Sequence, residues 1–391
     1  MIFNNHLQIP PLTCAEVNLK AIRHNLQQIR RLASRNKFFL PRRKNFKKID
    51  ILAVVKADAY GHGMKEVSQL LNREGVNLFA VSDITEGIYL RKEAGIKKPI
   101  LLLESNLPAH ARLIGSYHLT PTVCSLSLAQ ALNQYAKTRK KNISIHVKVD
   151  TGMGRLGIWH KDAFAFIEKL FTLRHLMIQG IYTHFPSADT DPSFTKRQIK
   201  HLYNLVIQLD KRGMVIPYVH AANSMGLAGY QTHILNLVRP GLMLYGLYPK
   251  HSLRKKIHLK PALSVKSKVI FLKDIEKGRS VSYGRTFVAS KKMRAATIPI
   301  GYNDGYLRCF SNQASVLIGG KRCPILGRVT MDQIVVDVSS LKNLSLGAEV
   351  VILGNQGKET ISADELASRA GTIHYEIVCS LGNRLPRCYI R

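Results

Sequence analysis

Short apolar runs alternate with segments of helical period from Ile51 to about residue 240. The intervening segments, such as Thr195 to Lys211, repeat apolar residues as on one face of a helix. This alternation predicts β–α units and a parallel sheet. About eight runs begin near Ile51, Leu78, Ile100, Leu119, Ile143, Met177, Ile216 and Leu235. Eight units in this length favour a (β/α)8 barrel, whereas a doubly wound open sheet stays possible because a strand count does not show closure.

Both ends of the chain depart from this pattern. The segment Cys14 to Arg35 has helical spacing and predicts a helix before the first strand. Past Pro261, strand-like alternation broken by Gly and Pro predicts a β-rich domain. The basic, weakly patterned stretch between Pro249 and Pro261 marks a boundary. We therefore expect a barrel domain over 1–255 with an amino-terminal helix, followed by a smaller, mostly β domain over 256–391.

Composition narrows the class of protein. The 391 residues, 46% of them hydrophobic, can bury a large core. Apolar stretches such as Pro99 to Leu103 are much shorter than the ~20 residues that cross a bilayer, and the start MIFNNHLQIPP has no signal-peptide features, so we expect a cytoplasmic protein. The six cysteines include no Cys-x-x-Cys pair, which predicts neither a disulfide framework nor a metal site.

The positive charge is unusual, since 58 Lys and Arg against 25 Asp and Glu give +33. Such a field attracts nucleic acid or an anionic surface without specifying either. The densest patch, Pro41 to Lys48, includes Phe46 and is compatible with phosphate contacts and a stacked base. No recognised nucleic-acid motif accompanies it, so a solvated surface loop is the favoured interpretation.

Lys56 is the most informative position. It directly follows the buried-strand pattern Ile51–Val55 and precedes the glycine-rich turn Gly61–Gly63. A partly desolvated lysine loses basicity and can act as an amine nucleophile at neutral pH. The alternative is a side chain that extends from the strand end into solvent.

Other polar residues also follow apolar runs, where the active site of a barrel is built. Taken singly, each has a structural alternative, because a histidine is often only hydrogen-bonded and a serine can cap a helix. Their shared placement predicts a functional site that includes Lys148, Asp150, His184, His220, Asn223, Ser224, Arg239 and Gly241.

The stretch Thr151–Gly157, TGMGRLG, formally satisfies the dinucleotide pattern G-x-G-x-x-G. No acidic residue follows about 20 positions later to bind a ribose, and Arg155 lies inside the loop. We interpret the glycines as permitting a tight turn that delivers Arg155 to a pocket as a fixed planar cation.

The motifs KADAYGHG, KVDTGMGRLG, YTHFPSAD, HAANS, RPGLMLYG, SYGRTF, GYNDGY, MDQIVVDVS and YEI occur in this order. Over nearly the whole chain they resemble the alanine racemases. The resemblance implies a pyridoxal 5'-phosphate enzyme with an amino-terminal barrel and a carboxyl-terminal β domain. Its implied reaction interconverts L- and D-alanine and supplies D-alanine for peptidoglycan.

The resemblance also implies a cofactor site. Lys56 would bind the cofactor covalently, Arg239 would face the pyridine nitrogen and His184 would position Arg239. A phosphate near the seventh and eighth strands is common in such barrels. The implied cofactor-binding residues are Lys56, Tyr60, Arg155, His184, Asn223, Ser224, Arg239, Gly241, Leu242 and Tyr375.

Racemisation needs a base on each face of the deprotonated α-carbon. By resemblance, Lys56 takes the proton from D-alanine and Tyr283, from the partner subunit of a head-to-tail homodimer, takes it from L-alanine. Arg155 and the Met331 backbone would bind the substrate carboxylate. Lys148 matches a lysine that many family members carry as a carbamate that holds the residue matching Arg155, and Tyr302 and Arg308 would narrow the entrance.

Departures from the family pattern are few, such as Asn303 in GYNDGY, where alanine is common, and none falls on a proposed base. Two alternatives remain. One is a related racemase for serine or a larger amino acid, and the other is a non-catalytic pyridoxal-phosphate protein. The β domain with Tyr283 argues against the second, since such proteins resemble the barrel alone.

Overall fold

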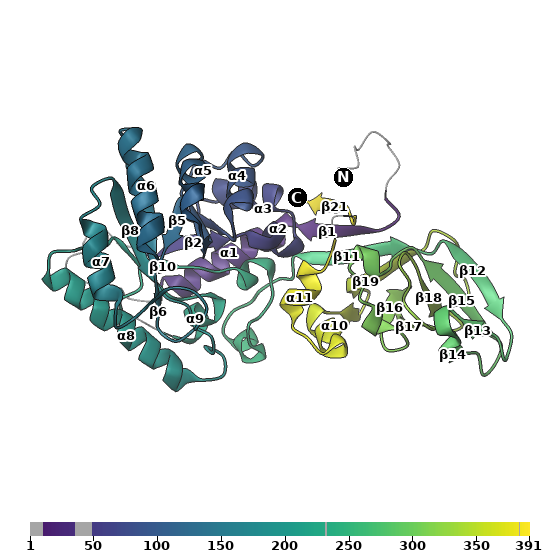
Figure 1. Ribbon diagram of the computed structural model, residues 1–391. Coiled ribbons are helices and arrows are strands. Elements are labelled where there is room, and N and C mark those ends of the chain that lie inside the picture. Colours follow the sequence, from purple (N-terminus) through teal and green to yellow (C-terminus); the bar gives the residue numbers. More distant parts are fainter. Residues whose placement is uncertain (1–10, 36–48, 231–232, 383) are drawn as a thin grey trace. The chain divides into compact units, whose positions relative to one another are not determined.

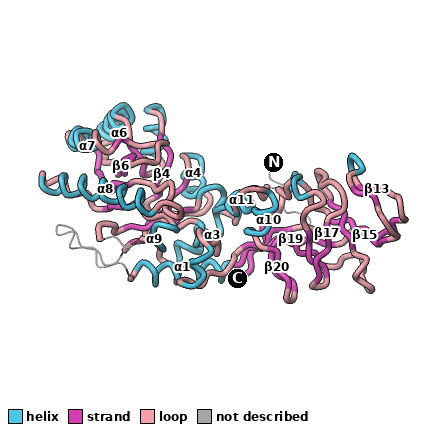
Figure 2. The backbone as a smooth tube through the Cα atoms, turned by 90° about the horizontal axis from the view of Figure 1, so that it is seen from below, coloured by secondary structure: helices cyan, strands magenta, loops and turns pink. Residues whose placement is uncertain are grey.

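The computed structural model describes residues 11–35, 49–230, 233–382 and 384–391 (Figures 1 and 2). The chain divides into two compact units. The barrel unit comprises Ala21–Ala59 and Gly63–Lys260. The β unit comprises Pro261–Arg391 with the segment through Lys20 and with Tyr60–His62. The basic run at 41–48 lies outside the described residues.

Eight parallel strands form the sheet of the barrel unit in the order β10-β2-β3-β4-β5-β6-β8-β9, with the short strand β7 (Ile158–Trp159) paired to β6. The order closes on itself, because the Asn236 N–H donates to the Val219 carbonyl (3.2 Å) and links β9 to β10. The barrel prediction is confirmed, and the open sheet is wrong. The strands are β2 (Asp50–Val54), β3 (Leu78–Val81), β4 (Ile100–Ser105), β5 (Thr120–Val123), β6 (Ile143–Asp150), β8 (Leu176–Tyr182), β9 (Tyr218–His220) and β10 (Leu237–Val238).

Helices connect these strands and lie around them in Figure 1. The longest, α8 (Pro192–Lys211), covers the predicted helical segment from Thr195. Asp191 caps it by accepting from the Phe194 N–H, and Leu202, Leu205 and Leu209 bury one face. The others are α1 (Leu19–Ala33), α2 (Lys56–Gly61), α3 (Met64–Arg73), α4 (Ile84–Lys92), α5 (Ala111–Ser116), α6 (Leu126–Thr138), α7 (Ala163–Phe171), α9 (Ser224–Gly229) and the 3-10 turns η1 (Pro108–His110), η2 (Leu242–Tyr245) and η3 (His251–Lys255).

The predicted helix from Cys14 was wrong for its first five residues. Cys14–Asn18 forms strand β1, whose burial alternates, and α1 begins at Leu19. β1 pairs antiparallel with β11 (Leu263–Lys268) and parallel with β21 (Arg387–Ile390). Val17 fits both a period of two and the helical period, so partners distant in sequence decide its structure.

The β unit confirms the β-rich prediction after Pro261. Its larger sheet has the order β17-β16-β19-β11-β1-β21 with β20 on β19; a three-stranded sheet, β12-β15-β18, and the hairpin β13-β14 complete it. The remaining bounds are β12 (Phe271–Ile275), β13 (Ser280–Val281), β14 (Phe287–Val288), β15 (Met293–Ile298), β16 (Ser315–Ile318), β17 (Lys321–Pro324), β18 (Ile334–Asp337), β19 (Glu349–Gln356), β20 (Glu359–Ile361), α10 (Ala363–Ala370), α11 (His374–Cys379), η4 (Tyr283–Arg285), η5 (Tyr302–Asp304) and η6 (Arg308–Phe310).

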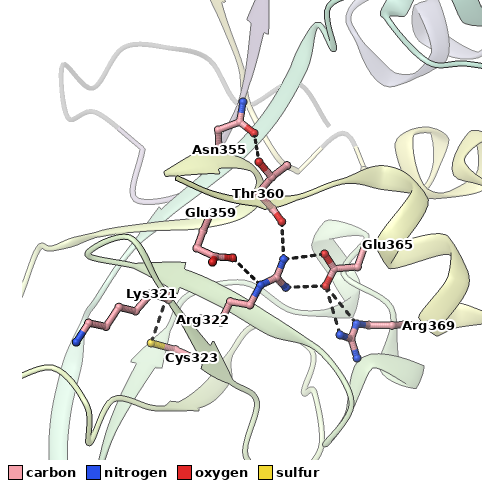
Figure 3. Close-up of polar contacts among 8 residues, drawn as sticks. All are labelled: Lys321, Arg322, Cys323, Asn355, Glu359, Thr360, Glu365 and Arg369. Carbon is pink, nitrogen blue, oxygen red and sulfur yellow. Dashed lines mark hydrogen bonds and ion pairs between the residues drawn. The ribbon is translucent and has the colours of Figure 1, made fainter. Parts of the chain in front are cut away.

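Arg322 on β17 joins three elements of the β unit (Figure 3). Its guanidinium donates to the Glu359 carboxylate on β20 (2.8 Å), to the Thr360 carbonyl (2.6 Å) and to Glu365 on α10 (2.8 Å). Arg369 contacts the same Glu365 carboxylate (3.3 Å). These bonds fasten α10 to the edge of the larger sheet.

Within the described ranges, no helix has both the length and the apolar character needed to span a membrane. The same ranges hold no cluster of His, Cys, Asp and Glu side chains suited to a metal ion.

Candidate active site

Lys56 lies just beyond the carboxyl end of β2, as predicted. The residues after it, Ala57 through Gly61, all have left-handed backbone angles, with φ between 51° and 77°. A left-handed turn of non-glycine residues is strained and persists only when its surroundings hold it. Glu86 provides such support, because its carboxylate accepts from the Ala57 N–H (2.6 Å) and the Ser82 N–H (2.7 Å). The backbone that carries Lys56 is therefore fixed.

Arg239 follows β10 and is 4% exposed. Its guanidinium donates to His220 Nδ1 (2.9 Å), to His184 Nδ1 (3.3 Å) and to the carbonyls of Thr183 (2.9 Å) and Ala221 (3.0 Å). None of these partners is a carboxylate, so its positive charge is not neutralised. Burial lowers the pKa of Arg239 to about 10, which keeps it protonated at neutral pH.

His220 contacts Arg239 directly, although its place after the seventh apolar run was the one sequence feature that suggested a role for it. Its Nε2 lies 2.9 Å from His146 Nδ1, and its ring stacks on Tyr182 with centroids 4.7 Å apart. A guanidinium only donates, so His220 Nδ1 must accept and Nε2 must carry the proton donated to His146. Burial, followed by the Arg239 charge, lowers the pKa of His146 to about 3, so the ring is neutral. A histidine inside the apolar strand β6 was the missed signal.

Four cations gather around His184 at the carboxyl ends of the strands. Burial lowers the pKa of His184 to about 3, and the charges of Arg239, Lys148, Arg155 and Lys56 add to this effect. The structure thus brings together four residues that the sequence predicts as one site. With this surplus of positive charge, the site suits an anionic ligand.

Asp150 and the glycines after β6 shape the loop that carries Arg155. The Asp150 carboxylate accepts from the N–H groups of Gly152 (2.8 Å) and Gly154 (2.9 Å). Gly157 has φ 129°, and a Cβ there would lie 2.8 Å from the Asp150 nitrogen. Only glycine fits this turn, which supports the interpretation of a shaped loop and not a dinucleotide site.

The loops after β9 and β10 meet at Ser224. Its hydroxyl oxygen accepts from the N–H groups of Gly241 and Met243, both at 3.3 Å. Neighbouring Asn223 accepts from the Gly226 N–H (2.8 Å) and caps α9, and Leu242 begins η2. Since the Ser224 oxygen already accepts twice, its own proton is available to an anionic oxygen. This donor set at the seventh and eighth strands fits a phosphate.

In the β unit, Tyr60 and Tyr375 lie together, with ring centroids 6.1 Å apart. Burial raises the pKa of Tyr60, so its phenol stays protonated. Gly61 permits the close approach of α11, because a Cβ there would lie 2.1 Å from the Val378 carbonyl oxygen.

Tyr283 lies at the tip of the β13-β14 hairpin and is 72% exposed. Its neighbour Ser282 has φ 64° and donates from its hydroxyl to the Arg328 carbonyl (2.7 Å), which holds the tip. Met331, 51% exposed, contacts a second loop, because its carbonyl accepts from the Asn303 N–H (3.1 Å). Because this hydrogen bond uses the backbone of residue 303, it does not depend on asparagine standing there where alanine is common in the family.

Tyr302 begins η5 in that second loop, and its N–H donates to the Thr330 carbonyl (3.0 Å). Arg308 begins η6 in the same unit. The structure therefore brings Tyr302 and Met331 onto adjoining loops of the β unit.

Two protein-family models match this chain and show the family to which it belongs. The model "Alanine racemase, N-terminal domain" matches residues 17–249, and "Alanine racemase, C-terminal domain" matches residues 262–389. The chain belongs to the alanine racemase family. This confirms the resemblance seen in the sequence and makes the chain a member of a family of pyridoxal-phosphate-dependent isomerases.

Curated alanine racemases agree over nearly their full lengths. The chain is 43% identical to alanine racemase of Carboxydothermus hydrogenoformans over 379 residues, 96% of this chain and 99% of the relative. It is 41% identical to that of Halothermothrix orenii over 378 residues, 96% of both chains.

Solved alanine racemases have the same fold. The structure from Clostridium difficile 630 matches with a TM-score of 0.89 and 35% identity, covering 98% of this chain and 97% of that one. The alanine racemase from Bacillus anthracis with bound L-Ala-P matches with a TM-score of 0.86 and 34% identity, covering 98% and 96%.

The residues of this alanine racemase family member fit pyridoxal phosphate. The Ser224 hydroxyl and the N-termini of α9 and η2 provide donors for the phosphate, and Lys56 and the protonated Arg239 both lie close enough to His184 for their charges to lower its pKa. Carboxylates are absent from the four partners of the Arg239 guanidinium, which leaves its charge available to the ligand.

Proposed function

We propose that this protein interconverts L- and D-alanine with pyridoxal phosphate and two bases, supplying D-alanine for peptidoglycan. The observation that carries the proposal is the cluster of four cations around His184, centred on a buried arginine whose bonding partners are all neutral. Membership of the alanine racemase family supports the substrate.

Bound pyridoxal phosphate would supply an electron-withdrawing ring that stabilises negative charge on the substrate α-carbon. Lys56 would hold it covalently at the end of β2. The phosphate would be held by the Ser224 hydroxyl, by the backbone at Asn223, Gly241 and Leu242, and by the phenols of Tyr60 and Tyr375.

Arg239 would face the pyridine nitrogen. Its pKa of about 10 keeps it protonated, and a cation there disfavours protonation of the ring nitrogen. His220 and His184 accept its hydrogen bonds as neutral rings and fix its direction. The weakened electron withdrawal favours return of the proton to the α-carbon over competing reactions.

The two bases would act from opposite faces. The Lys56 amine would take the α-proton of D-alanine, and Tyr283 would then donate a proton to the opposite face, which gives L-alanine. In the other direction, the Tyr283 oxygen would take the α-proton of L-alanine, and Lys56 would donate the proton that gives D-alanine. Arg155 and the Met331 backbone would orient the substrate carboxylate, while Tyr302 and Arg308 would narrow the entrance. Because Tyr283 is 72% exposed at a hairpin tip, it can reach the site of a partner subunit in a head-to-tail homodimer.

The decisive experiment measures D-alanine formation from L-alanine by the purified, cofactor-loaded protein. We expect rapid formation, with slower turnover of serine, lysine and arginine in the same assay. A folded, cofactor-loaded protein that forms no D-alanine would overturn the proposal, and turnover of another amino acid would identify the related racemase instead.

A variant at Tyr283 tests the two-base assignment. Tyr283→Phe removes the proton-accepting oxygen and keeps the ring, so we expect retained cofactor absorbance with racemisation lowered at least ~100-fold. Tyr306→Phe removes a phenol elsewhere in the β unit and serves as the matched control. Undiminished activity of Tyr283→Phe would refute its role as a base.

A further inference from the structure

A cavity of about 450 Å³ opens at the amino-terminal end of the barrel strands. Its wall includes the first residues of four strands, Leu78, Thr120, Ile143 and Tyr218. Lys56 and Arg239 follow the opposite, carboxyl ends of β2 and β10. The cavity is thus separate from the proposed cofactor site, and its volume is typical of a small-molecule pocket.

The rim of this cavity is cationic. The exposed side chains of Lys97, His118 and Lys141 line it, together with half-buried Arg91, and no Asp or Glu is among the described residues that line it. Isolated surface charges are usually balanced by neighbours of opposite sign, whereas charges of one sign in a cavity focus the field on a ligand. The ligand should therefore be an anion.

Arg91 makes this rim rigid. Its guanidinium donates to the carbonyls of Ile96 and Lys98 in one loop and of Tyr117 and His118 in the next. His118 has φ 50°, a left-handed angle that such bonds can hold in place. The loops that carry Lys97 and His118 are consequently fixed before any ligand arrives, which lowers the entropy lost on binding.

The inner wall includes His146, which also belongs to the Arg239 network. His146 Nδ1 accepts from His220, so in the neutral ring the remaining proton is on Nε2 and can be donated to a ligand. Gly180 on β8 makes room for this ring, because a Cβ there would lie 2.4 Å from His146 Nδ1. The cavity is therefore connected to Arg239 through two hydrogen-bonded imidazoles.

We propose that this cavity is a second binding site, for a small phosphate-bearing anion, with Lys97 and Lys141 as its cationic contacts and with the His146–His220 pair linking its occupancy to Arg239. An anion that accepts from His146 strengthens the hydrogen bond that His146 accepts from His220. His220 in turn becomes a stronger acceptor for the Arg239 guanidinium.

Calorimetric titration of the holoenzyme tests the site, since bound cofactor fills the other phosphate position. The probes are inorganic pyrophosphate and AMP. We expect saturable binding that Lys97→Gln/Lys141→Gln weakens at least ~10-fold, while the control Lys161→Gln/Lys169→Gln, which removes two exposed lysines that do not line the cavity, leaves it unchanged. Tighter binding of AMP than of pyrophosphate would identify an organic phosphate as the ligand, and the reverse an inorganic one.

Equal weakening by both lysine pairs would show general attraction to the +33 chain and overturn the site, as would the absence of binding by either probe. The link to Arg239 rests on the proposed function and is read separately, as a shift in cofactor absorbance at saturating probe. Binding without that shift would refute the link. A holoenzyme that binds pyrophosphate but forms no D-alanine would keep the site and remove the proposed function.

Discussion

Lys148 differs from the other cations of the cluster because burial, with the charges of Arg239 and Arg155, lowers its pKa to about 8. A neutral amine adds to carbon dioxide, forming a carbamate and releasing a proton, whereas an ammonium does not. The neutral fraction rises with pH through about 8, so carbamate formation should rise over the same interval. The product would be an anion in the field of Arg155 and Arg239, where it would hold Arg155.

We therefore predict that depletion of carbon dioxide raises the KM for alanine about 3- to 10-fold, and that added bicarbonate restores it. The measurement is steady-state kinetics at pH 7 and 8.5, with labelled bicarbonate and NMR to detect the carbamate. Lys148→Gln should not respond to bicarbonate. A wild-type KM that is independent of bicarbonate, with no labelled carbon on the protein, would refute the carbamate.

His220 provides the acceptor for one buried N–H group of Arg239. His220→Phe retains an aromatic ring against Tyr182 but leaves one buried N–H of Arg239 without its acceptor. We expect a loss of about 1–3 kcal/mol in the free energy of unfolding and a shifted cofactor absorbance. His220→Gln, whose amide oxygen can still accept, is the control. Urea unfolding that gives equal losses for both variants would contradict the role of this hydrogen bond.

At the scale of elements, the left-handed turn after Lys56 depends on Glu86 of α4. Its carboxylate accepts from two N–H groups, those of Ala57 and Ser82. Glu86→Ala should lower the free energy of unfolding by about 2–3 kcal/mol and lower activity, because the strained turn loses its support and Lys56 loses its fixed position. Thermal melting and D-alanine formation measure the two effects.

Glu93→Ala provides the comparison, since it removes an exposed glutamate at the end of the same helix. Glu86→Gln should lie between the two, because its amide oxygen retains one acceptor. If Glu86→Ala melts no lower than Glu93→Ala, the turn does not depend on these two bonds.

These elements also show how far the sequence predicts the structure. The runs from Ile51 to Leu235 predict the barrel strands because buried parallel strands are apolar on both faces. Strand β1 was missed because it forms only by pairing with β11 and β21, which are distant in the sequence: Val17 pairs with Leu263 and Ala15 with Arg387. The left-handed turn was also missed, since alanine and tyrosine rarely adopt this conformation and aspartate adopts it only as a single residue.

The candidate site was predictable to a similar depth. Position after apolar runs predicted Lys56, Lys148 and Arg239, three of the four cations around His184, and the glycine-rich loop predicted Arg155. Tyr283 does not follow an apolar run of the barrel, so its role was predicted only from the family resemblance. Neither the apolar pattern nor the family resemblance pointed to His146. Its contact with His220 distinguishes it from an ordinary structural histidine, and that contact is visible only in the structure.

At the scale of the whole molecule, the proposal requires two chains for each active site. Lys56 belongs to the barrel unit and Tyr283 to the β unit, where Tyr283 is 72% exposed. If Tyr283 acts in the site of the partner subunit, Lys56→Ala and Tyr283→Phe damage the same site from different chains. Each variant alone should therefore be nearly inactive.

Mixing the two inactive variants under conditions that exchange subunits should restore activity. Random exchange makes about half of the dimers mixed, and each mixed dimer has one site with both Lys56 and Tyr283 intact, so about a quarter of wild-type activity should return. The measurement is D-alanine formation before and after exchange, with each variant carried through the same treatment alone as the control. If both bases of a site came from one chain, no mixed dimer would contain an intact site. Mixing would then restore nothing, even though light scattering showed that the subunits had exchanged.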